Sequence, residues 1–470
     1  MIDTQAIRSK ILDLAMRGQL TEQLPEDGNA EELYQQILEE KQKLAKEGKI
    51  KKEKPLPEIT DKEIPFEIPE NWKWVRLKEL CTKIVDGDHN PPAGVKEATS
   101  YLMLSAQNIN KGTLTNLDNV RYLSADVFEE ENKRTKLEVD DVLLTIVGTI
   151  GRSCVYQGGF NISFQRSVAV ITTLIYSKFL KYAFDIPFIQ SFMIDNATGA
   201  AQLGFYLNKL EKLLIPLPPN AEQKRIVEKI EQAFSILDTI DELQAQYADN
   251  LTALKSKLID AAIQGKLTEH LPEDGTAEEL YQQIQEEKQK LIKEGKIKKQ
   301  KPLPEISDEE IPFDIPENWK WVRLSHITYS IFAGKDKPKD FVTLKDKKHP
   351  IPVVANAVTN DGIIGYTSIA TANAGTLTVA GRGTIGFTCY RDYDYCPIVR
   401  LLVIDVADQI YPQYIKFVFQ RLTVDSVGSS IPQLTVPMIR PKLIPLPPLA
   451  EQKRIVQKLD EILPLCEKLK

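Results

Sequence analysis

The sequence predicts an α+β protein in which two α/β domains are carried on an antiparallel coiled-coil helical spacer, with a pseudo-two-fold internal repeat. Three observations support this fold class: a long segment that occurs twice, heptads of apolar residues, and two intervening blocks rich in Val, Ile, Thr and Gly. The 470 residues are enough for two or three domains. The composition, 42% hydrophobic and 27% charged, is that of a globular chain and excludes global disorder.

The first of these observations is an internal sequence repeat. Residues 18–77 recur as 265–324 without a gap, with 51 identities in 60 positions. A second repeated string, IPLPPxAEQKRIV, begins at Ile215 and again at Ile444. When both alignments are extended, only residues 242–247 lack a counterpart, so the chain is two copies of one unit closed almost into a circle. Such an arrangement predicts a pseudo-two-fold axis between the halves.

The spacer is predicted from heptads. A helix over 221–264 is on the order of 66 Å long at ~1.5 Å per residue. Its seam positions alternate steps of four and three and are apolar except for Gln244: Ile226, Ile230, Ala233, Leu237, Ile240, Gln244, Tyr247, Leu251, Leu254, Leu258 and Ala261. The two ends of the chain carry the same pattern, at Ile7, Ile11 and Leu14 and at Ile455, Leu459, Ile462, Cys466 and Leu469. We expect both ends to pack against the central helix; the alternative is that each stripe faces its own domain.

The other elements follow in chain order. Residues 30–47 and 277–294 are predicted to form short helices with i,i+4 charge pairs, each followed by a Lys- and Pro-rich connector that we interpret mainly as a solvated linker. Residues 141–155 and 375–390 are predicted to be strands joined by turns, and helices are expected at 177–193 and 412–424.

These patterns divide the chain into five segments. They are an N-terminal helical region and linker (1–71), a first variable domain (72–219), a central helical region (220–318), a second variable domain (319–449) and a C-terminal helix (450–470). The last segment is short, and residues 1–20 are expected to complete it.

Charge and cysteine usage narrow the class of protein. The net charge of −6 divides into +1 for residues 72–219, +6 for 319–449 and −13 for the remainder, so phosphate binding by the two blocks is compatible with an acidic chain. Five cysteines without a C-x-x-C pair and four scattered histidines suggest neither disulfides nor zinc. Charges within the first apolar stretch argue against a signal peptide or membrane span, so we expect a cytoplasmic protein that does not bind membranes.

Two strings resemble catalytic or cofactor-binding motifs, but each lacks a feature that its motif requires. The string at 381–386, GRGTIG, satisfies G-x-G-x-x-G, but strand-like sequence follows it where a dinucleotide site needs a helix, so a glycine-bent strand pair is the better interpretation. Asn90-Pro91-Pro92-Ala93 resembles a methyltransferase N-P-P-aromatic loop but ends in alanine. We therefore predict no catalytic residue, no metal ligand and no cofactor in this chain.

Two equivalent frames with unlike domains suit the recognition of two unlike DNA half-sites. Arg reads guanine and Asn or Gln reads adenine, while Lys, Ser and Thr hold phosphates. For each candidate an ordinary surface residue is the alternative. The candidate DNA contacts are Asp86, Gly87, Asp88, His89, Asn90, Gln107, Asn108, Lys111, Arg152, Gln165, Arg166 and Gln202 in the first block, and Lys335, Lys337, Lys339, Asn356, Arg382, Arg391, Arg400 and Gln433 in the second.

The motifs resemble a known family. IPLPPxAEQKRIV opening a helix twice, IPENWKWVRL before each variable block and DGDHNPP early in the first block are similar to the specificity subunit, HsdS, of Type I restriction-modification systems. The resemblance covers the whole chain. It implies that the two blocks are target recognition domains, that the repeats are conserved regions forming the spacer, and that the subunit is not itself an enzyme.

The resemblance also implies partners. These are double-stranded DNA, two modification subunits that use S-adenosylmethionine, and restriction subunits, bound through them, that use ATP and Mg²⁺. Two alternatives remain at this point. One is a non-catalytic scaffold whose paired helices assemble proteins without reading DNA sequence, and the other is a stand-alone methyltransferase, which would need to bind S-adenosylmethionine itself.

Overall fold

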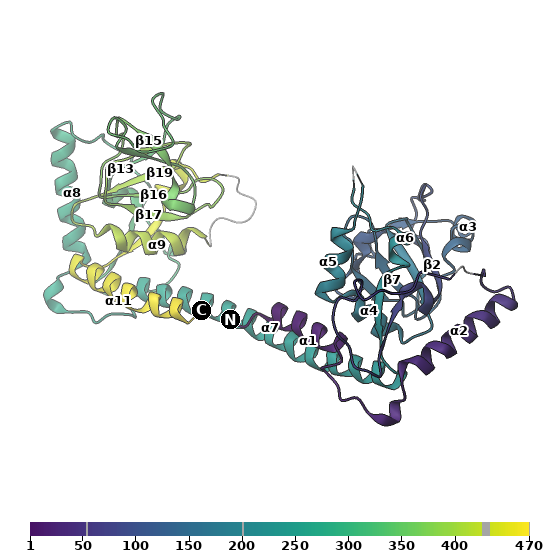
Figure 1. Cartoon of the computed structure of the whole chain (residues 1–470). Coiled ribbons are helices and arrows are strands. Elements are labelled where there is room, and N and C mark those ends of the chain that lie inside the picture. The colour runs from purple at the N-terminus through teal and green to yellow at the C-terminus, as the bar shows by residue number, and fades with distance from the viewer. Residues whose placement is uncertain (53–54, 200–201, 425–432, 470) are drawn as a thin grey trace. The chain divides into compact units, whose positions relative to one another are not determined.

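The chain folds into two compact units, Met1–Gln244 and Ala245–Lys470. The computed structural model describes residues 1–52, 55–199, 202–424 and 433–469 (Figure 1). The boundary between the units lies inside the six residues, 242–247, that have no counterpart in the repeat. The internal repeat is therefore also the structural division of the molecule.

The first unit contains six helices, the first part of a seventh, and eleven strands among its described residues. The helices are α1 (Thr4–Met16), α2 (Ala30–Lys46), α3 (Ala125–Thr135), α4 (Ser177–Phe184), α5 (Pro187–Asp195), α6 (Leu207–Leu210) and α7 (Asn220–Ile263), which continues into the second unit. The strands are β1 (Lys73–Arg76), β2 (Cys81–Asp86), β3 (Tyr101–Leu104), β4 (Ile109–Asn110), β5 (Thr113–Leu114), β6 (Arg121–Tyr122), β7 (Val142–Thr145), β8 (Ser153–Val155), β9 (Asn161–Phe164), β10 (Val168–Thr173) and β11 (Leu214–Leu217).

The second unit repeats this plan. Its helices are α8 (Ala277–Lys293), α9 (Pro412–Val424), α10 (Val436–Ile439) and α11 (Leu449–Lys468). Its strands are β12 (Lys320–Arg323), β13 (Thr328–Ala333), β14 (Ile351–Val354), β15 (Ile363–Thr367), β16 (Thr376–Val379), β17 (Thr388–Arg391), β18 (Cys396–Pro397), β19 (Leu402–Val406) and β20 (Leu443–Leu446).

The two variable blocks share one topology although their sequences scarcely match. A four-stranded antiparallel sheet has the order β2-β10-β7-β8 in the first and β13-β19-β16-β17 in the second. A three-stranded sheet places β3 between β6 and β9, and β14 likewise between β15 and β18, with one parallel pairing in each. The predicted α+β class with two α/β domains is confirmed.

In each variable domain, two strands from the repeated sequence pair where the chain enters and leaves the domain. Strand β1 pairs with β11 from Lys73 opposite Leu217 to Arg76 opposite Leu214, and β12 pairs with β20 in the same register. The chain therefore enters and leaves each domain at adjacent positions. We call each such strand pair, together with the repeat-derived helices around it, the frame of its unit.

A buried carboxylate joins the strand pair to the long helix in both frames. Glu222 of α7 is fully buried and accepts from the Trp72 indole N–H at 2.8 Å, while Glu451 of α11 accepts from the Trp319 indole N–H at 2.9 Å. The Arg225 guanidinium contacts the Asp27 carboxylate at 2.5 Å, and the matching Arg454 guanidinium contacts Asp274 at the same distance. Hydrogen bonding to these guanidinium groups lowers the pKa of both aspartates.

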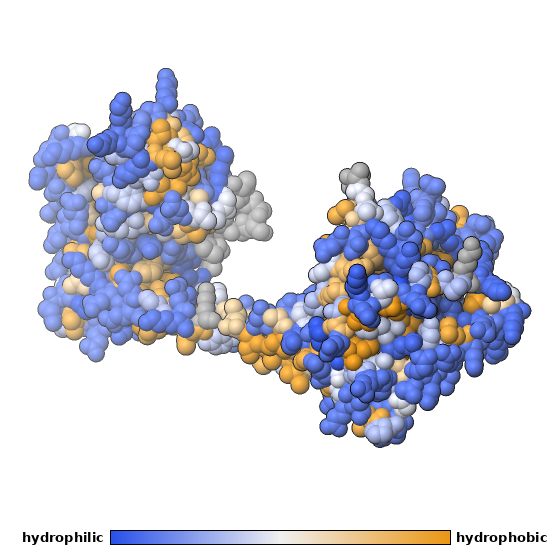
Figure 2. Space-filling view, viewed as in Figure 1, coloured by the Kyte–Doolittle hydropathy of each residue, from blue (hydrophilic) through white to orange (hydrophobic). Residues whose placement is uncertain are grey.

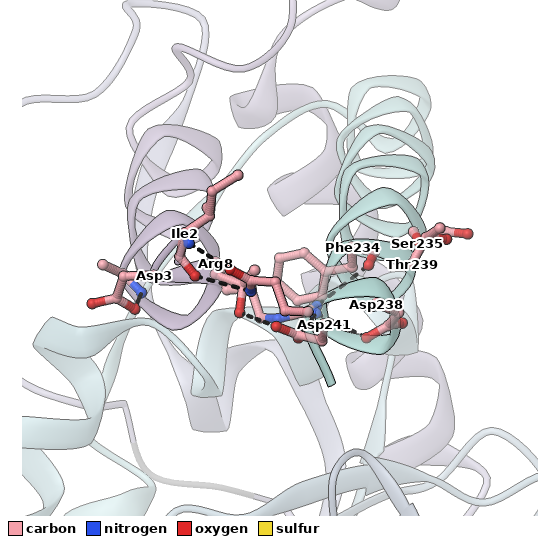
Figure 3. Close-up of polar contacts among 11 residues, drawn as sticks. Ile2, Asp3, Arg8, Phe234, Ser235, Asp238, Thr239 and Asp241 are labelled. Atoms are coloured by element: carbon pink, nitrogen blue, oxygen red, sulfur yellow. Dashed lines mark hydrogen bonds and ion pairs between the residues drawn. The ribbon is translucent and has the colours of Figure 1, made fainter. Parts of the chain in front are cut away.

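Helix α1 lies antiparallel along α7 within the first unit (Figure 3). The Arg8 guanidinium reaches the carboxylates of Asp238 at 2.8 Å and Asp241 at 3.1 Å, and the Ile2 amide donates to the Gln244 side chain at 2.5 Å. In the second unit Lys255 of α7 contacts Glu467 of α11 at 3.1 Å, which is the repeat-equivalent of the Arg8 and Asp238 pair. The predicted antiparallel pairing of the chain ends with the central helix is confirmed.

The predicted apolar stripe is divided between two environments. Ile226 and Ile230 are fully buried and belong to the core cluster of the first variable domain, so the alternative that the stripe faces its own domain holds at this end of α7. In the middle of the helix, Tyr247 is 44% exposed and Leu254 is 43% exposed. The helices that pack against α7 therefore leave these two residues in the middle of the stripe partly exposed.

Two local predictions, the helix at 177–193 and the glycine-rich string at 381–386, had different outcomes. Residues 177–193 form two helices rather than one, since Pro187 has no backbone N–H to continue α4 and instead occupies the first turn of α5. The glycine-rich string 381–386 is the turn between strands β16 and β17, as the strand-pair interpretation predicted. Among the described residues, no helix is long and apolar enough to span a bilayer.

Candidate nucleic-acid interface

The loops at the ends of the sheet strands bring several candidate residues of the first domain together. We call residues 87–92, 147–152, 165–167 and 202–206 the first rim. The Asp88 amide donates to Phe164 O at 2.8 Å and the Arg166 amide donates to Asp88 O at 2.8 Å, so the loops after β2 and β9 run side by side. Gly87 permits this approach, because a Cβ there would lie 2.1 Å from the Phe164 carbonyl oxygen.

The β7–β8 turn completes the first rim. The Gly148 amide donates to Leu203 O at 3.1 Å, and a Cβ on Gly148 would lie 3.0 Å from the Gln202 side-chain nitrogen. The Arg166 guanidinium lies 3.5 Å from the Tyr206 hydroxyl and over its ring. Of the candidates, the rim thus gathers Asp88, Gln165, Arg166 and Gln202, with the exposed side chains of His89, Asn90 and Arg152 on the same loops.

The candidate Asp86 fixes the start of this rim through bonds within the protein. Asp86 is 8% exposed, and its side chain accepts from a ring nitrogen of His89 at 2.7 Å and from the Arg134 guanidinium. Arg134 of α3 also donates to the Asp86 carbonyl at 2.8 Å. Burial raises the pKa of the nearby Glu131 carboxyl, and the charge of Asp88 adds to this effect. Acidic groups, Asp86 and Glu131, therefore lie next to the start of the first rim.

The second domain forms an equivalent second rim, which we define as residues 334–339, 356–357, 381–386, 398–400 and 433–434. The Val399 amide donates to Lys335 O at 2.9 Å, and a Cβ on Gly334 would lie 2.6 Å from the Pro397 carbonyl oxygen, so Gly334 takes the place of Gly87. Lys335, Lys337 and Lys339 are all exposed. The Lys337 ammonium lies 3.5 Å from the centre of the Phe341 ring.

Two arginines meet one glutamine in the second rim. The Gln433 side-chain oxygen accepts from Arg382 at 3.0 Å and from Arg400 at 3.4 Å. Asn356 holds the neighbouring backbone, because its side chain accepts from the Gly381 amide and donates to Val399 O, both at 2.8 Å. Asn356 thus lies at the rim, but both ends of its amide are used within the protein.

The structure does not bring every candidate to a rim. Asn108 is 2% exposed, and its side chain bonds the Ser105 amide and the carbonyls of Thr115 and Asn116. Arg391 is also 2% exposed and donates to the Thr378 and Tyr393 hydroxyls and to a carbonyl. These buried, saturated side chains do not fit a base-reading role, and for them the prediction was wrong.

The remaining two candidates lie elsewhere on the first domain. Lys111 lines a separate pocket with Lys178, Lys181 and Glu231, between the β4–β5 turn, α4 and α7. Gln107 is exposed beside Ala106, whose amide donates to the Ser167 hydroxyl of the first rim at 3.0 Å.

The architecture is thus a pair of mixed sheet domains with polar, partly cationic loop rims on helical frames, which is the class of a modular nucleic-acid-binding protein. The family model described as the type I restriction modification DNA specificity domain matches residues 69–246 and 316–469. The chain belongs to this family and is a DNA target recognition subunit of a type I restriction-modification enzyme.

Individual relatives agree with this assignment. The chain is 28% identical to the specificity subunit of the type I restriction enzyme EcoAI of Escherichia coli, over 99% of this chain and 90% of that protein. It is also 28% identical to the EcoEI specificity subunit of Escherichia coli with the same coverage. A solved structure described as the structural basis of complex assembly and conformational transition of the type I R-M system has a TM-score of 0.57, 18% identity, and coverage of 86% of this chain and 93% of that chain. This structural likeness concerns the fold.

Proposed function

We propose that each variable domain reads one half of a bipartite DNA target and that α7 sets the gap between the halves. The observation that carries this proposal is the pairing of one sheet topology with two chemically different rims. Where the first rim has Asp88 and Arg166, the matching positions of the second have Lys335 and Val399. Base edges are distinguished by donor and acceptor pattern, so unlike rims on like scaffolds select unlike sequences.

The same proposal includes the partners of the enzyme. Two modification subunits dock on the two repeated frames, and restriction subunits join through them. Support comes from the apolar surface along the spacer helices (Figure 2), where Ile236 is 63% and Leu243 is 58% exposed. An exposed apolar row on a polar helix marks a protein contact. S-adenosylmethionine belongs to the modification subunits and ATP with Mg²⁺ to the restriction subunits, while this chain is non-catalytic.

A domain exchange tests the proposal. Residues 78–214 are replaced by the corresponding block of a relative, and the DNA of cells expressing the chain with its modification subunits is mapped for methylated adenine. We expect one half of the bipartite target to change and the other to persist. A change in both halves, or in neither, contradicts independent recognition by the two domains.

The purified chain also separates this function from its alternatives. Binding to mixed-sequence DNA should weaken steeply as salt rises, because phosphate contacts release counterions. A scaffold that does not contact DNA would show no such binding. Transfer of labelled methyl groups to DNA by the chain alone would contradict its non-catalytic role.

A further inference from the structure

Two arginines of the second rim are held at one neutral acceptor. Arg382 comes from the β16–β17 turn and Arg400 from the β18–β19 turn, and both donate to the side-chain oxygen of Gln433. Both arginines are exposed. Within the described residues, neither guanidinium has a carboxylate at ion-pair distance, whereas Arg323, Arg421 and Arg454 of the same unit each have one.

The arrangement leaves positive charge uncompensated. Two guanidinium groups that share one oxygen repel each other, and a neutral amide does not cancel their charge. An acceptor-rich partner that binds both groups would remove this repulsion. The rim is therefore electrostatically prepared for a ligand with clustered hydrogen-bond acceptors.

The backbone around the arginines is fixed. The Gly381 amide donates to the Asn356 side chain at 2.8 Å, the Leu434 amide donates to Gly381 O at 2.8 Å, and the Arg400 amide donates to Gly334 O at 3.2 Å. These bonds tie together all the segments from which Arg382, Arg400 and Gln433 project. Preorganised side chains lose less entropy on binding, so the site suits specific rather than diffuse contact.

The remaining donors match one base. Each guanidinium has five N–H donors, and the Gln433 oxygen takes one from each, so both retain free donor pairs. Guanine presents two acceptors, O6 and N7, in the major groove, and arginine pairs with both at once. Cytosine, adenine and thymine do not offer that acceptor pair in the major groove.

We propose that Arg382 and Arg400 read guanine in the half-site contacted by the second domain, with Gln433 as the positioning residue for both. The inference rests on the proposed function and adds the identity of the base. In the described part of the first rim, Arg152 and Arg166 share no acceptor, and Arg166 lies against Tyr206 beside the acidic Asp88. Its half-site is read by a different set of groups.

Selection from a randomised DNA duplex library tests this inference with the complete assembly of this chain and its modification subunits. The wild type is compared with Arg382→Gln, Arg400→Gln and Gln433→Leu. Each arginine variant should lose about 5- to 150-fold of its preference at one G·C pair of a single half-site, with the other half-site unchanged. Gln433→Leu should reduce preference at the same pairs.

Two further variants make the result interpretable. Arg382→Lys keeps the charge but not the paired donors, so it should bind DNA with the wild-type salt dependence while losing the guanine preference. Arg152→Gln, an exposed rim position of the first domain, should leave the second half-site intact.

Other outcomes overturn the inference. Uniform weakening across all sequences, with the salt slope reduced by about 1 and the preferences unchanged, would assign the arginines to phosphates. Loss at a position that is not G·C would also refute guanine recognition. If the wild type enriches no bipartite sequence at all, the proposed function itself fails, which is a distinguishable result.

Discussion

The length of α7 should determine the spacing of the DNA target. The helix is 44 residues long, and an insertion of seven residues after Gln244 adds about 10 Å at ~1.5 Å per residue. Since DNA rises ~3.4 Å per base pair, the gap between half-sites should grow by about three base pairs. One heptad changes the phase of the apolar stripe by only about 20°, so the faces of the helix stay aligned.

The insertion point is chosen from the contacts of α7. The bonds between Ile2, just before α1, and Gln244 are the last that join the N-terminal segment to α7, and the ion pair of α11 with α7 is at Lys255. An insertion after Gln244 therefore leaves both helix pairs in place. Four inserted residues would lengthen the helix by only ~6 Å but would rotate the part that follows by ~40°. This variant should therefore be less active than the heptad insertion, although its insertion is shorter.

The assay is methylation mapping of cells that express the variant with its modification subunits. Both half-site sequences should persist while the gap between them increases. Gln246→Ala, an exposed position in the same segment, is the length-neutral control and should leave the gap unchanged. An active heptad-insertion complex with the original gap would refute the idea that helix length sets it.

The remaining predictions concern the frames and their stability. The fragment 1–241 contains one frame and one variable domain. We expect it to form a homodimer that, together with modification subunits, methylates a palindrome of the first half-site. A fragment that sediments as a folded monomer at micromolar concentration would contradict this prediction. Glu222→Leu leaves the Trp72 indole, the Thr21 hydroxyl and the Gln23 amide without their shared acceptor, so the free energy of unfolding should fall by about 3 kcal/mol, whereas exposed Glu228→Gln should change it little in the same denaturation experiment. Burial lowers the pKa of Lys288 to about 8, and because the unfolded chain keeps the ordinary higher pKa, the unfolded state binds more protons between these values. Wild-type stability should therefore rise relative to Lys288→Met as pH increases from 8 to 10, and exposed Lys293→Met should follow the wild type; parallel curves for all three would show that burial does not perturb this lysine.

The frame was predictable because its signals are local. The heptads, the helix-starting proline string and the i,i+4 charge pairs of the short helices each act within a few residues, and the structure places α2, α7 and α8 within a residue or two of their predicted bounds. The depth of burial along α7 was less predictable. It depends on how far α1 extends and on which side chains of the domain reach the helix.

The rims could be predicted only in part. Arg166 and Gln433 are polar residues in loops, and so is Asn108, yet Asn108 is buried and bonds the backbone of its own turn. The residue type does not distinguish these cases, because an amide can bond its own turn, as in Asn108, or bond groups distant in the sequence, as in Gln433. Asp86 was a candidate, but its bond to Arg134 could not be predicted, because a helix 48 residues away supplies the guanidinium.

The adjacent entry and exit of each variable domain have a consequence for how the gene can change. Because β1 pairs with β11, and β12 with β20, the chain between each pair of strands leaves the frame and returns to the same place as one inserted block. The blocks 78–214 and 325–443 differ in length, yet the register of the strand pair is the same in both units. The frames on either side are encoded by nearly identical stretches of the gene. Recombination between these stretches can therefore replace one inserted block with another while the strand pairs at its ends are kept. New target sequences can then arise by exchange of whole blocks rather than by gradual substitution, and the assembly that holds the partners need not evolve with them.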